Sequence, residues 1–375
     1  MNKFTFLKMS VVLTCFVAGS LLVGTVATDI DIKYNDFGVS YAQEKDTENQ
    51  TPFNGQHIQD EMVITLVGDV MLSSRVGQAI SLHGPEYPWN HTAEVLVDSD
   101  ITIANLECPV SERGQPESNK EYTFRATPGA LTGAAKAGVD VFTLANNHTL
   151  DYGPIALLDT IENIKKNNIL YAGAGSNEKE ANRPAILDIG KKKVAVLAFS
   201  RIIPRSSWIA GEEKVGLASG HNYTLMMDSI QSVRQKADII VVGMHWGSEN
   251  EDLPAQKEIE IARALVDAGA DIVVGHHPHV LQGIEIYKGK VIAYSLGNFI
   301  FTTSTFPKGK EGAIMQVTVS RDGKLETRIF PTQIANGSTL ISKGEERKSV
   351  LARMNLLCRP FKTSINNSGE IQKIP

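Results

Sequence analysis

The sequence predicts an α/β fold in which buried strands alternate with helices. Several apolar runs are continuous rather than alternating, which is typical of parallel strands covered on both faces by helices. Between them lie segments with helical periodicity, at residues 154–166 and 254–268, each with a proline near its start. The 375 residues, of which 42% are hydrophobic and 21% charged, can bury a substantial core in one large domain.

Five of the predicted strands run directly into polar residues. These strands are 62–67 before Gly68-Asp69, 101–104 before Asn105-Leu106-Glu107, 141–145 before Asn146-Asn147-His148, 239–244 before His245, and 271–275 before His276. Parallel strands align their carboxyl ends at one edge of a sheet, where functional crevices open. We therefore expect a single site that gathers Asp69, Glu107, Asn147, His148, His245, His277 and His279.

The last of these strands leads into His276-His277-Pro278-His279. Pro278 disfavours helical backbone at His277, so we expect this segment to be extended. In an extended chain alternate side chains point the same way, so His277 and His279 should face one point and His276 should face away. Two neutral imidazoles at one point suit a divalent metal, and a polar loop with solvated histidines is the alternative.

The same blocks carry a family resemblance that extends from about Met62 to Pro331. Gly68-Asp69-Val70-Met71, Asn105-Leu106-Glu107-Cys108-Pro109 and Ala145-Asn146-Asn147-His148 resemble the first half of the CapA-type poly-γ-glutamate capsule biosynthesis family. Residues 245–249, 275–282 and 294–299 resemble its second half. The resemblance implies a calcineurin-like metallophosphoesterase fold, which is a sandwich of two mixed β-sheets flanked by helices with a metal centre on its rim.

The resemblance also implies roles for the site residues. The expected metal ligands are Asp69, Glu107, Asn147, His245, His277 and His279. Manganese, iron and zinc all suit such mixed ligands. His148 is the candidate catalytic imidazole, and Asp151 either fixes its tautomer or begins the next helix. Met71 stands where that fold usually has a histidine ligand, so one metal, two metals and a binding-only site all stay open.

The N-terminus indicates the compartment. Lys3 and Lys8 precede the apolar stretch 9–27, and acidic residues follow it, which predicts a cytoplasmic N-terminus with the remainder outside. Residues 1–28 are read as a signal-anchor or, with a small-residue site at Ser40-Tyr41-Ala42, as a cleaved signal peptide. The chain is thus a single-pass cell-membrane protein with an extracellular C-terminal domain, or a secreted one. Residues 29–60 form a tether, 61–332 the CapA-like domain and 333–375 a C-terminal extension.

The C-terminal third has antiparallel signals. Hairpins are predicted at 283–295 and 313–331, the latter with an Asp322-Gly323 turn, and both are expected to complete the second sheet. A helix should cover about 345–357, and the last dozen residues look loose. Cys108 and Cys358 are the one pair available outside the apolar segment, and we expect no disulfide between them.

Two functional hypotheses follow. The net charge of −5 argues against a nucleic-acid partner. By resemblance, the chain is an extracytoplasmic, membrane-attached accessory protein for synthesis, export or anchoring of poly-γ-glutamate capsule. Its partners would be the ATP-dependent amide ligase and the small membrane subunit of the synthase complex, because this sequence has no phosphate-binding loop of its own. Alternatively, it is an extracellular metal-dependent hydrolase of phosphoesters or of the glutamyl polymer.

Overall fold

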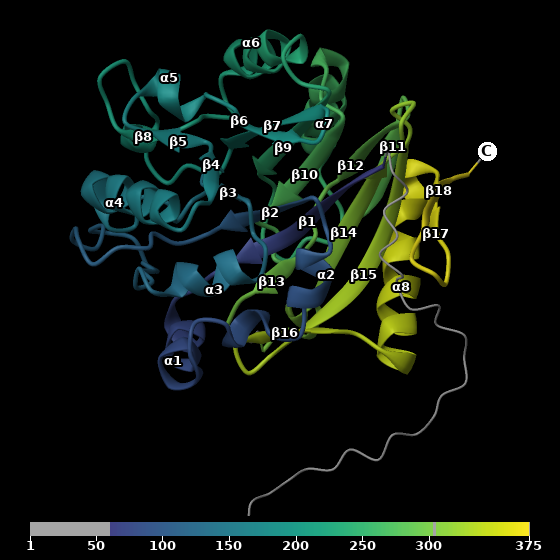
Figure 1. Ribbon diagram of the computed structural model, residues 1–375, viewed down its shortest axis with the longest axis horizontal. Coiled ribbons are helices and arrows are strands. Elements are labelled where there is room, and N and C mark those ends of the chain that lie inside the picture. The colour runs from purple at the N-terminus through teal and green to yellow at the C-terminus, as the bar shows by residue number, and fades with distance from the viewer. Residues whose placement is uncertain (1–60, 303–304, 375) are drawn as a thin grey trace, which may run out of the picture. The chain divides into compact units, whose positions relative to one another are not determined.

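The computed structural model describes residues 61–302 and 305–374 (Figure 1). The expected signal-anchor at 1–28 and the tether at 29–60 therefore lie outside the described residues. Within the described part of the chain, no helix is long and apolar enough to cross a membrane. The described residues belong to a single compact unit.

An eight-stranded mixed sheet carries the first half of the expected site. Its strands, in spatial order, are β16 (Ser338–Ile341), β15 (Leu325–Ala335), β14 (Glu311–Val319), β1 (Met62–Val70), β2 (Ile101–Leu106), β3 (Val141–Thr143) and β4 (Leu170–Ala172). Strands β1 to β4 are parallel, and β14 runs antiparallel to the first part of β1. The short strand β13 (Asn298–Ile300) pairs in parallel with the end of β1, beside Asp69.

A six-stranded sheet carries the second half. Its order is β11 (Ile284–Tyr287), β12 (Lys290–Ala293), β10 (Ile272–His276), β9 (Ile239–His245), β7 (Lys192–Ser200) and β6 (Ala185–Ile189). The four central strands are parallel and the two edge strands are antiparallel to their neighbours. A separate pair, β5 (Ala174–Gly175) and β8 (Gly216–Leu217), lies outside both sheets.

The two sheets pack face to face, and this explains why the strands are apolar on both faces. Successive side chains of a strand alternate between faces. Leu66 of β1 and Val241 of β9 lie in the shared core between the sheets. Val67 instead packs in the cluster under the helices of the first sheet, and Val242 in the cluster under those of the second. Every residue of β1, β2, β9 and β10 is buried, as predicted for doubly covered strands.

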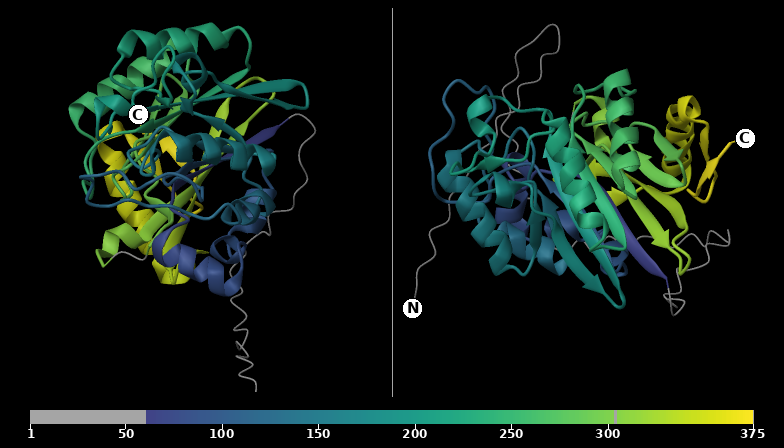
Figure 2. Two further views of the ribbon diagram at one scale, coloured as in Figure 1. Left: turned by 90° about the vertical axis from the view of Figure 1, so that its left-hand side faces the viewer. Right: turned by 90° about the horizontal axis from the view of Figure 1, so that it is seen from above.

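The helices form the outer layers (Figures 1 and 2). The first sheet is covered by α1 (Ser74–His83), α2 (Ala93–Val97), α3 (Ala130–Lys136) and α4 (Gly153–Lys166). The second sheet is covered by α5 (Glu178–Ala181), α6 (Tyr223–Arg234) and α7 (Gln256–Ala268). The helices predicted at 154–166 and 254–268 correspond to α4 and α7, so both predictions are confirmed.

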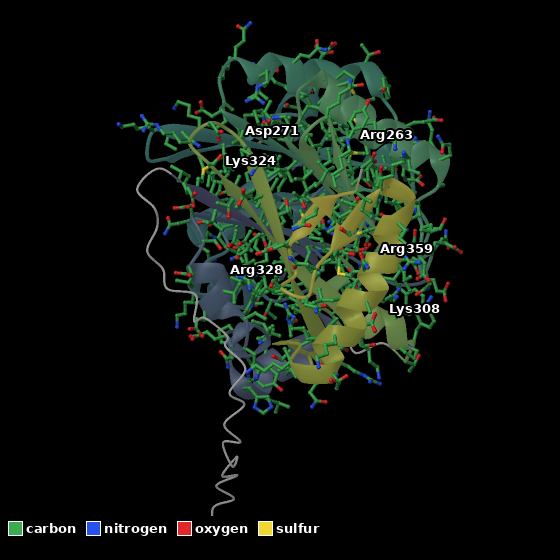
Figure 3. All side chains as sticks on the ribbon, turned by 90° about the vertical axis from the view of Figure 1, so that its right-hand side faces the viewer. Arg263, Asp271, Lys308, Lys324, Arg328 and Arg359 are labelled. Carbon is green, nitrogen blue, oxygen red and sulfur yellow. The ribbon has the colours of Figure 1, made fainter. Side chains whose placement is uncertain are left out.

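At the C-terminus, α8 (Gly344–Cys358) confirms the helix predicted at 345–357 and packs its buried face on the inter-sheet core. Figure 3 shows this flank of the molecule. Four charged side chains join α8 to neighbouring loops, and we name them the α8 latch. Its ion pairs are Arg353 with Asp252 at 2.8 Å, Arg353 with Glu311, and Lys308 with Asp252.

Both predicted hairpins are present, but they do not share a sheet. The first is β11–β12 and completes the six-stranded sheet, whereas β14–β15 extends the eight-stranded sheet, so its assignment to the second sheet is wrong. The last residues are not loose either. They form a hairpin of β17 (Thr363–Ile365) and β18 (Ile371–Lys373), which is fixed by a hydrogen bond from Ile329 N to Gly369 O at 2.8 Å. The predicted boundary at residue 332 falls inside β15.

Two glycines allow the strand ends to approach each other. A Cβ on Gly68 would lie 2.0 Å from the carbonyl oxygen of Gly297, and one on Gly275 would lie 1.9 Å from that of Tyr294. Both distances are far below van der Waals contact, so only glycine fits. These close approaches place Asp69 and His276, the next residues along the chain, at the rim of the sandwich.

Candidate metal centre

The polar strand ends gather on one rim, as the sequence predicts. Asp69 of β1 is in register with Asn105 of β2, and His245 of β9 is in register with His276 of β10. Glu107 follows β2 directly, and its backbone N–H donates to Val70 O at 2.8 Å. Since the two sheets face each other, these ends converge from opposite sides of the sandwich.

Asp69 is the hub of the cluster and is fully buried. Its Oδ1 accepts a hydrogen bond from Asn105 Nδ2 at 2.8 Å, and its Oδ2 accepts one from the backbone N–H of His277 at 3.2 Å. Two imidazoles flank the same carboxylate, with His276 Nδ1 at 3.1 Å from Oδ1 and His279 Nδ1 at 3.2 Å from Oδ2. Burial raises the pKa of Asp69, but these two histidines outweigh it and hold that pKa well below its ordinary value.

Glu107 is the member that most needs a further partner. Its side chain is fully buried, and neither carboxylate oxygen has a hydrogen-bond partner among the described residues. The nearest basic atoms are His245 Nε2 at 3.6 Å and His279 Nε2 at 3.7 Å from Oε1. Burial and the charge of Asp69 raise the pKa of Glu107 well above its ordinary value. An enclosed carboxylate without donors is costly unless a cation compensates it.

Two sets of ligand atoms could hold such a cation. Asp69, Glu107 and His245 form one set, and Glu107, His277 and His279 form the other, with the atoms of each set within 4.8 Å of one another. Glu107 belongs to both sets. Asn147 adds its amide oxygen, which lies 2.9 Å from His245 Nε2. Mixed imidazole, carboxylate and amide donors around an orphaned buried carboxylate fit a divalent metal ion.

The imidazoles of the cluster are held in different charge states. Burial lowers the pKa of His277 to about 4, and burial also keeps that of His245 well below its ordinary value. Burial acts in the same direction on His279, but Glu107 and Asp69 outweigh it and raise its pKa to about 10. His245 and His277 are therefore neutral at neutral pH, which is the form in which imidazole binds metals.

The loop of histidines departs from the expected geometry. His277 has φ 94° and His279 has φ 56°, so the segment is not extended, and both residues occupy backbone conformations that are strained for a side chain. His276 is still part of β10, on the same face as Ile272 and Val274, and its ring lies against Asp69, so the prediction that its side chain faces away is wrong. The His276 side chain is 3% exposed and contributes to the cluster.

His148 lies beside the candidate ligands, and its ring contacts Asp151 and Lys120. Its Nδ1 is 2.7 Å from Asp151 Oδ2, so a proton on Nδ1 would be donated to that carboxylate. Lys120 also pairs with Asp151, donates to Asn147 O at 2.7 Å and lies 2.9 Å from His148 Nδ1. Burial lowers the pKa of His148 and the Lys120 charge adds to this, although Asp151 opposes it. Asp151 therefore contacts both the His148 ring and Lys120, as expected for a residue that orients the ring.

Amide side chains help to fix the loops around the cluster. Asn146 Nδ2 donates to Leu106 O at 2.8 Å, and its Oδ1 accepts from Thr149 Oγ1 at 2.8 Å, which joins the third strand end to the second. Asn298 Oδ1 lies 2.9 Å from His279 Nδ1 and so orients that ring. Trp246 is fully buried and its indole N–H donates to Tyr294 O at 3.0 Å, so it packs beneath the metal loop.

Three further observations concern Met71, Lys120 and the two cysteines. Met71 is 1% exposed and lies in the apolar cluster under the helices, so it offers no ligand. Lys120 was missed because it lies in the aperiodic segment between β2 and α3, where no sequence signal marks it. Cys108 and Cys358 are both buried free thiols, as expected.

Comparisons with known proteins bear on the same residues. The family described as "Bacterial capsule synthesis protein PGA_cap" matches residues 63–303, which include every candidate ligand. Capsule biosynthesis protein CapA of Bacillus anthracis is 33% identical over 286 residues, covering 74% of this chain and 69% of that protein. PGA biosynthesis protein CapA of Bacillus subtilis (strain 168) is 29% identical over 287 residues, covering 76% of this chain and 75% of that protein.

Solved structures are more distant. A candidate 5′-nucleotidase of Staphylococcus aureus in complex with alpha-ketoglutarate has a TM-score of 0.44 and 16% identity, covering 76% of this chain and 55% of that one. A likeness of this degree carries no argument about chemistry.

Proposed function

Because the chain belongs to the bacterial capsule synthesis protein PGA_cap family, we propose that it is an accessory protein of poly-γ-glutamate capsule biosynthesis. The observation that carries the proposal is the buried cluster around Asp69 and Glu107, which lies within the span shared with the capsule proteins. We further propose that this cluster is a metal centre of the metallophosphoesterase type and that the domain works outside the membrane, tethered by residues 1–28.

The residues of the centre have separable tasks in this proposal. Asp69, Glu107, Asn147, His245, His277 and His279 would hold a divalent ion. When bound, such an ion acts as a Lewis acid toward a carboxylate or phosphoryl oxygen. Asp151 and Lys120 fix the ring of His148. Because the pKa of His148 is lowered, its ring is neutral at neutral pH and its Nε2 accepts a hydrogen bond rather than donating a proton.

This charge state favours binding over hydrolysis. Protonation of a leaving group would require an imidazolium at His148, which burial and the Lys120 charge disfavour. A neutral ring fixed by Asp151 can instead accept a hydrogen bond from an amide N–H of the polymer. The family match and a neutral His148 ring together support an accessory role in synthesis, export or anchoring over an esterase activity.

A complementation experiment tests the accessory role. The capsule is quantified in strains whose only copy carries His148→Gln or the ligand substitution His277→Ala, with the surface level of the protein measured in parallel. We expect near-normal capsule with His148→Gln and loss of capsule with His277→Ala. Normal capsule with His277→Ala at normal protein level would refute a role for the metal centre in this process.

The alternative, a metal-dependent hydrolase, rests on the His148–Asp151 pair at the edge of the centre. Its test is turnover of a phosphodiester and of γ-linked polyglutamate by the purified chain loaded with Mn²⁺. Positioned proton transfer accelerates such reactions about 10²- to 10⁴-fold, so His148→Gln should lower any turnover rate by that factor while the metal content is unchanged. Turnover that survives this substitution would exclude His148 as the catalytic group.

Location and partners have their own tests. Protease added to intact protoplasts should digest the domain if residues 1–28 place it outside, and full protection would contradict this.

Affinity purification of the full chain from detergent-solubilised membranes should recover the amide ligase and the small membrane subunit of the polymer synthase. If the solubilised membranes contain the ligase but neither subunit is recovered with the purified chain, a stable complex would be contradicted.

A further inference from the structure

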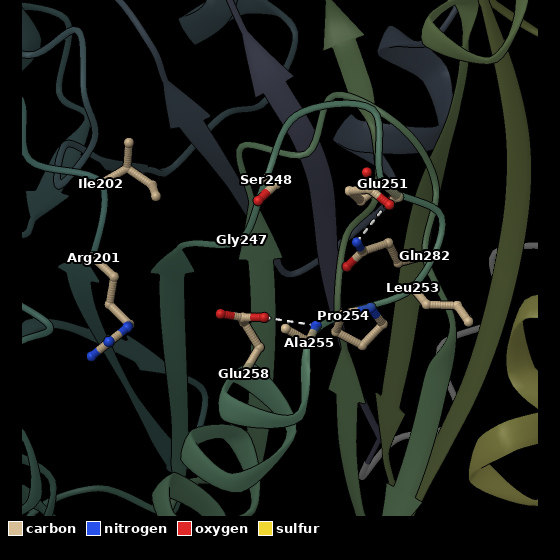
Figure 4. A pocket seen from close by; sticks show the side chains of 10 residues that line it. All are labelled: Arg201, Ile202, Gly247, Ser248, Glu251, Leu253, Pro254, Ala255, Glu258 and Gln282. Carbon is tan, nitrogen blue, oxygen red and sulfur yellow. Dashed lines mark hydrogen bonds between the residues drawn. The ribbon is translucent and has the colours of Figure 1, made fainter.

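A cavity of about 430 Å³ opens beside the metal centre. Figure 4 shows that its walls come from the loop after β7, the loop after β9 and the start of α7. Arg201 lines one side, and Ser248, Glu251, Glu258 and Gln282 line the others. Small-molecule sites in proteins have volumes of about 300–1,000 Å³, so this cavity has room for a ligand of that class.

The cavity and the metal centre are built from the same loops. The backbone N–H of Arg201 donates to the carbonyl oxygen of the ligand His245 at 2.8 Å. The backbone N–H of Asn250 donates to Pro278 O at 2.8 Å, which ties the cavity wall to the histidine loop. Gln282 follows that loop directly in sequence. A ligand in the cavity would therefore lie against the segments that hold His245 and His277.

Two largely buried side chains each turn one acceptor oxygen toward the cavity. Gln282 is 2% exposed, and its Nε2 donates to Glu251 O at 2.8 Å, which leaves Oε1 without a donor among the described residues. Glu258 is 9% exposed, and its Oε2 accepts from the backbone N–H of Ala255 at 2.7 Å, which leaves Oε1 likewise without a described donor. Both side chains point their oxygens into the space drawn in Figure 4. These oxygens open into the cavity, where a ligand that supplies N–H groups can donate to them.

The opposite wall offers a cation. Arg201 uses Nη1 to donate to Gly220 O at 2.8 Å, and the remainder of its guanidinium lines the cavity. A guanidinium matches the geometry of a carboxylate. The cavity thus presents a carboxylate-binding group on one side and ammonium- or amide-binding groups on the other, which is the pattern that recognises an amino-acid unit.

We propose that this cavity binds the amino-terminal glutamyl unit of a γ-linked glutamate chain, with its ammonium at Glu258 and Gln282 and its carboxylate at Arg201. An internal unit of that polymer carries a negative charge and no positive one, and Glu251 and Glu258 would repel it. The terminal unit is zwitterionic and so complements both walls. The identity of the polymer rests on the proposed function, whereas the zwitterionic character of the ligand rests on the cavity itself.

Calorimetric titration of the purified full chain with γ-linked triglutamate tests the proposal. We expect saturable binding that weakens about ten- to a hundredfold with Arg201→Met or Glu258→Gln, since each removes one charged hydrogen bond. Arg205→Met, on the same loop but outside the cavity wall, is the matched control and should bind normally. Melting temperature and Mn²⁺ content of each variant establish that it folds.

The amino-acetylated triglutamate provides the decisive comparison, because it lacks the ammonium but keeps every carboxylate. It should bind weakly to the wild type, and Glu258→Gln should not weaken it further. Equal binding of the free and acetylated oligomers, or no binding of either, would overturn the proposal. Because this assay uses purified protein, it can succeed or fail independently of the capsule measurements that test the proposed function.

Discussion

Replacing Glu107 by glutamine should move the stability of this protein in opposite directions with and without metal. The carboxylate is fully buried and has no donor among the described residues, and burial together with Asp69 raises its pKa well above its ordinary value. Between that ordinary value, about 4.3, and the raised one, the folded chain binds more protons than the unfolded chain. Stability of the metal-free protein should therefore fall as pH rises through this window.

The size of the effect follows from the burial. Leaving a buried polar group unpaired costs about 1–3 kcal/mol, and glutamine keeps the shape of the side chain while it removes the charge. For a domain of this size, one kcal/mol corresponds to roughly 2 °C of melting temperature. Metal-free Glu107→Gln should thus melt about 2–6 °C above the metal-free wild type at about pH 8. A metal at about 100 times its Kd contributes about 2.7 kcal/mol, or roughly 5 °C, to the wild type alone.

Differential scanning calorimetry of the EDTA-treated full chain, with and without Mn²⁺, measures both effects. The control is Glu112→Gln, because Glu112 is an exposed glutamate five residues along the chain. This control should match the wild type under both conditions. If Glu107→Gln melted with the wild type when metal-free and showed the same rise with Mn²⁺, the reasoning from its burial would be refuted.

Three further outcomes follow from the structure. His277→Ala should lower the Mn²⁺ content measured by elemental analysis. His276→Ala should lower it too, because the His276 ring contacts Asp69, and unchanged Mn²⁺ content in this variant would contradict a role for that contact in metal binding. Gly275→Ala should destabilise by about 1–3 kcal/mol or more in urea unfolding because its Cβ meets backbone, whereas Gly129→Ala in open space should be neutral. Burial raises the pKa of Asp252, but the cations of the α8 latch outweigh it and lower that pKa. Asp252→Asn should therefore lower the melting temperature at pH 7, and the difference from the wild type should become smaller below about pH 4.

The fold and most of the ligands could be predicted because two regularities coincide. Strands that are apolar at every position are buried on both faces, and the carboxyl ends of parallel strands meet at one edge. Asp69, His245 and the histidine run each follow such a strand directly, so their convergence follows from topology alone. No side-chain detail was needed for that step.

What could not be predicted depends on backbone conformation after the strand ends. The left-handed φ values of His277 and His279 end the extended alternation after β10, whereas His276, still in the strand, keeps the face of Ile272 and Val274 and meets Asp69. Lys120 reaches the site from an aperiodic loop whose path is fixed by tertiary contacts. The placement of β14–β15 depends on pairing with β1, which is more than 240 residues earlier in the sequence and carries no local signal for its partner.

Met71 lies two residues after Asp69 and offers no ligand, because its side chain belongs to the apolar cluster beneath the helices. Asp69 is flanked by His276 and His279, which hold its pKa well below the ordinary value. Glu107 has no hydrogen-bond donor among the described residues, its nearest basic atoms being the ring nitrogens of His245 and His279, and it belongs to both ligand sets. A cation bound in this cluster would therefore stabilise Glu107 most.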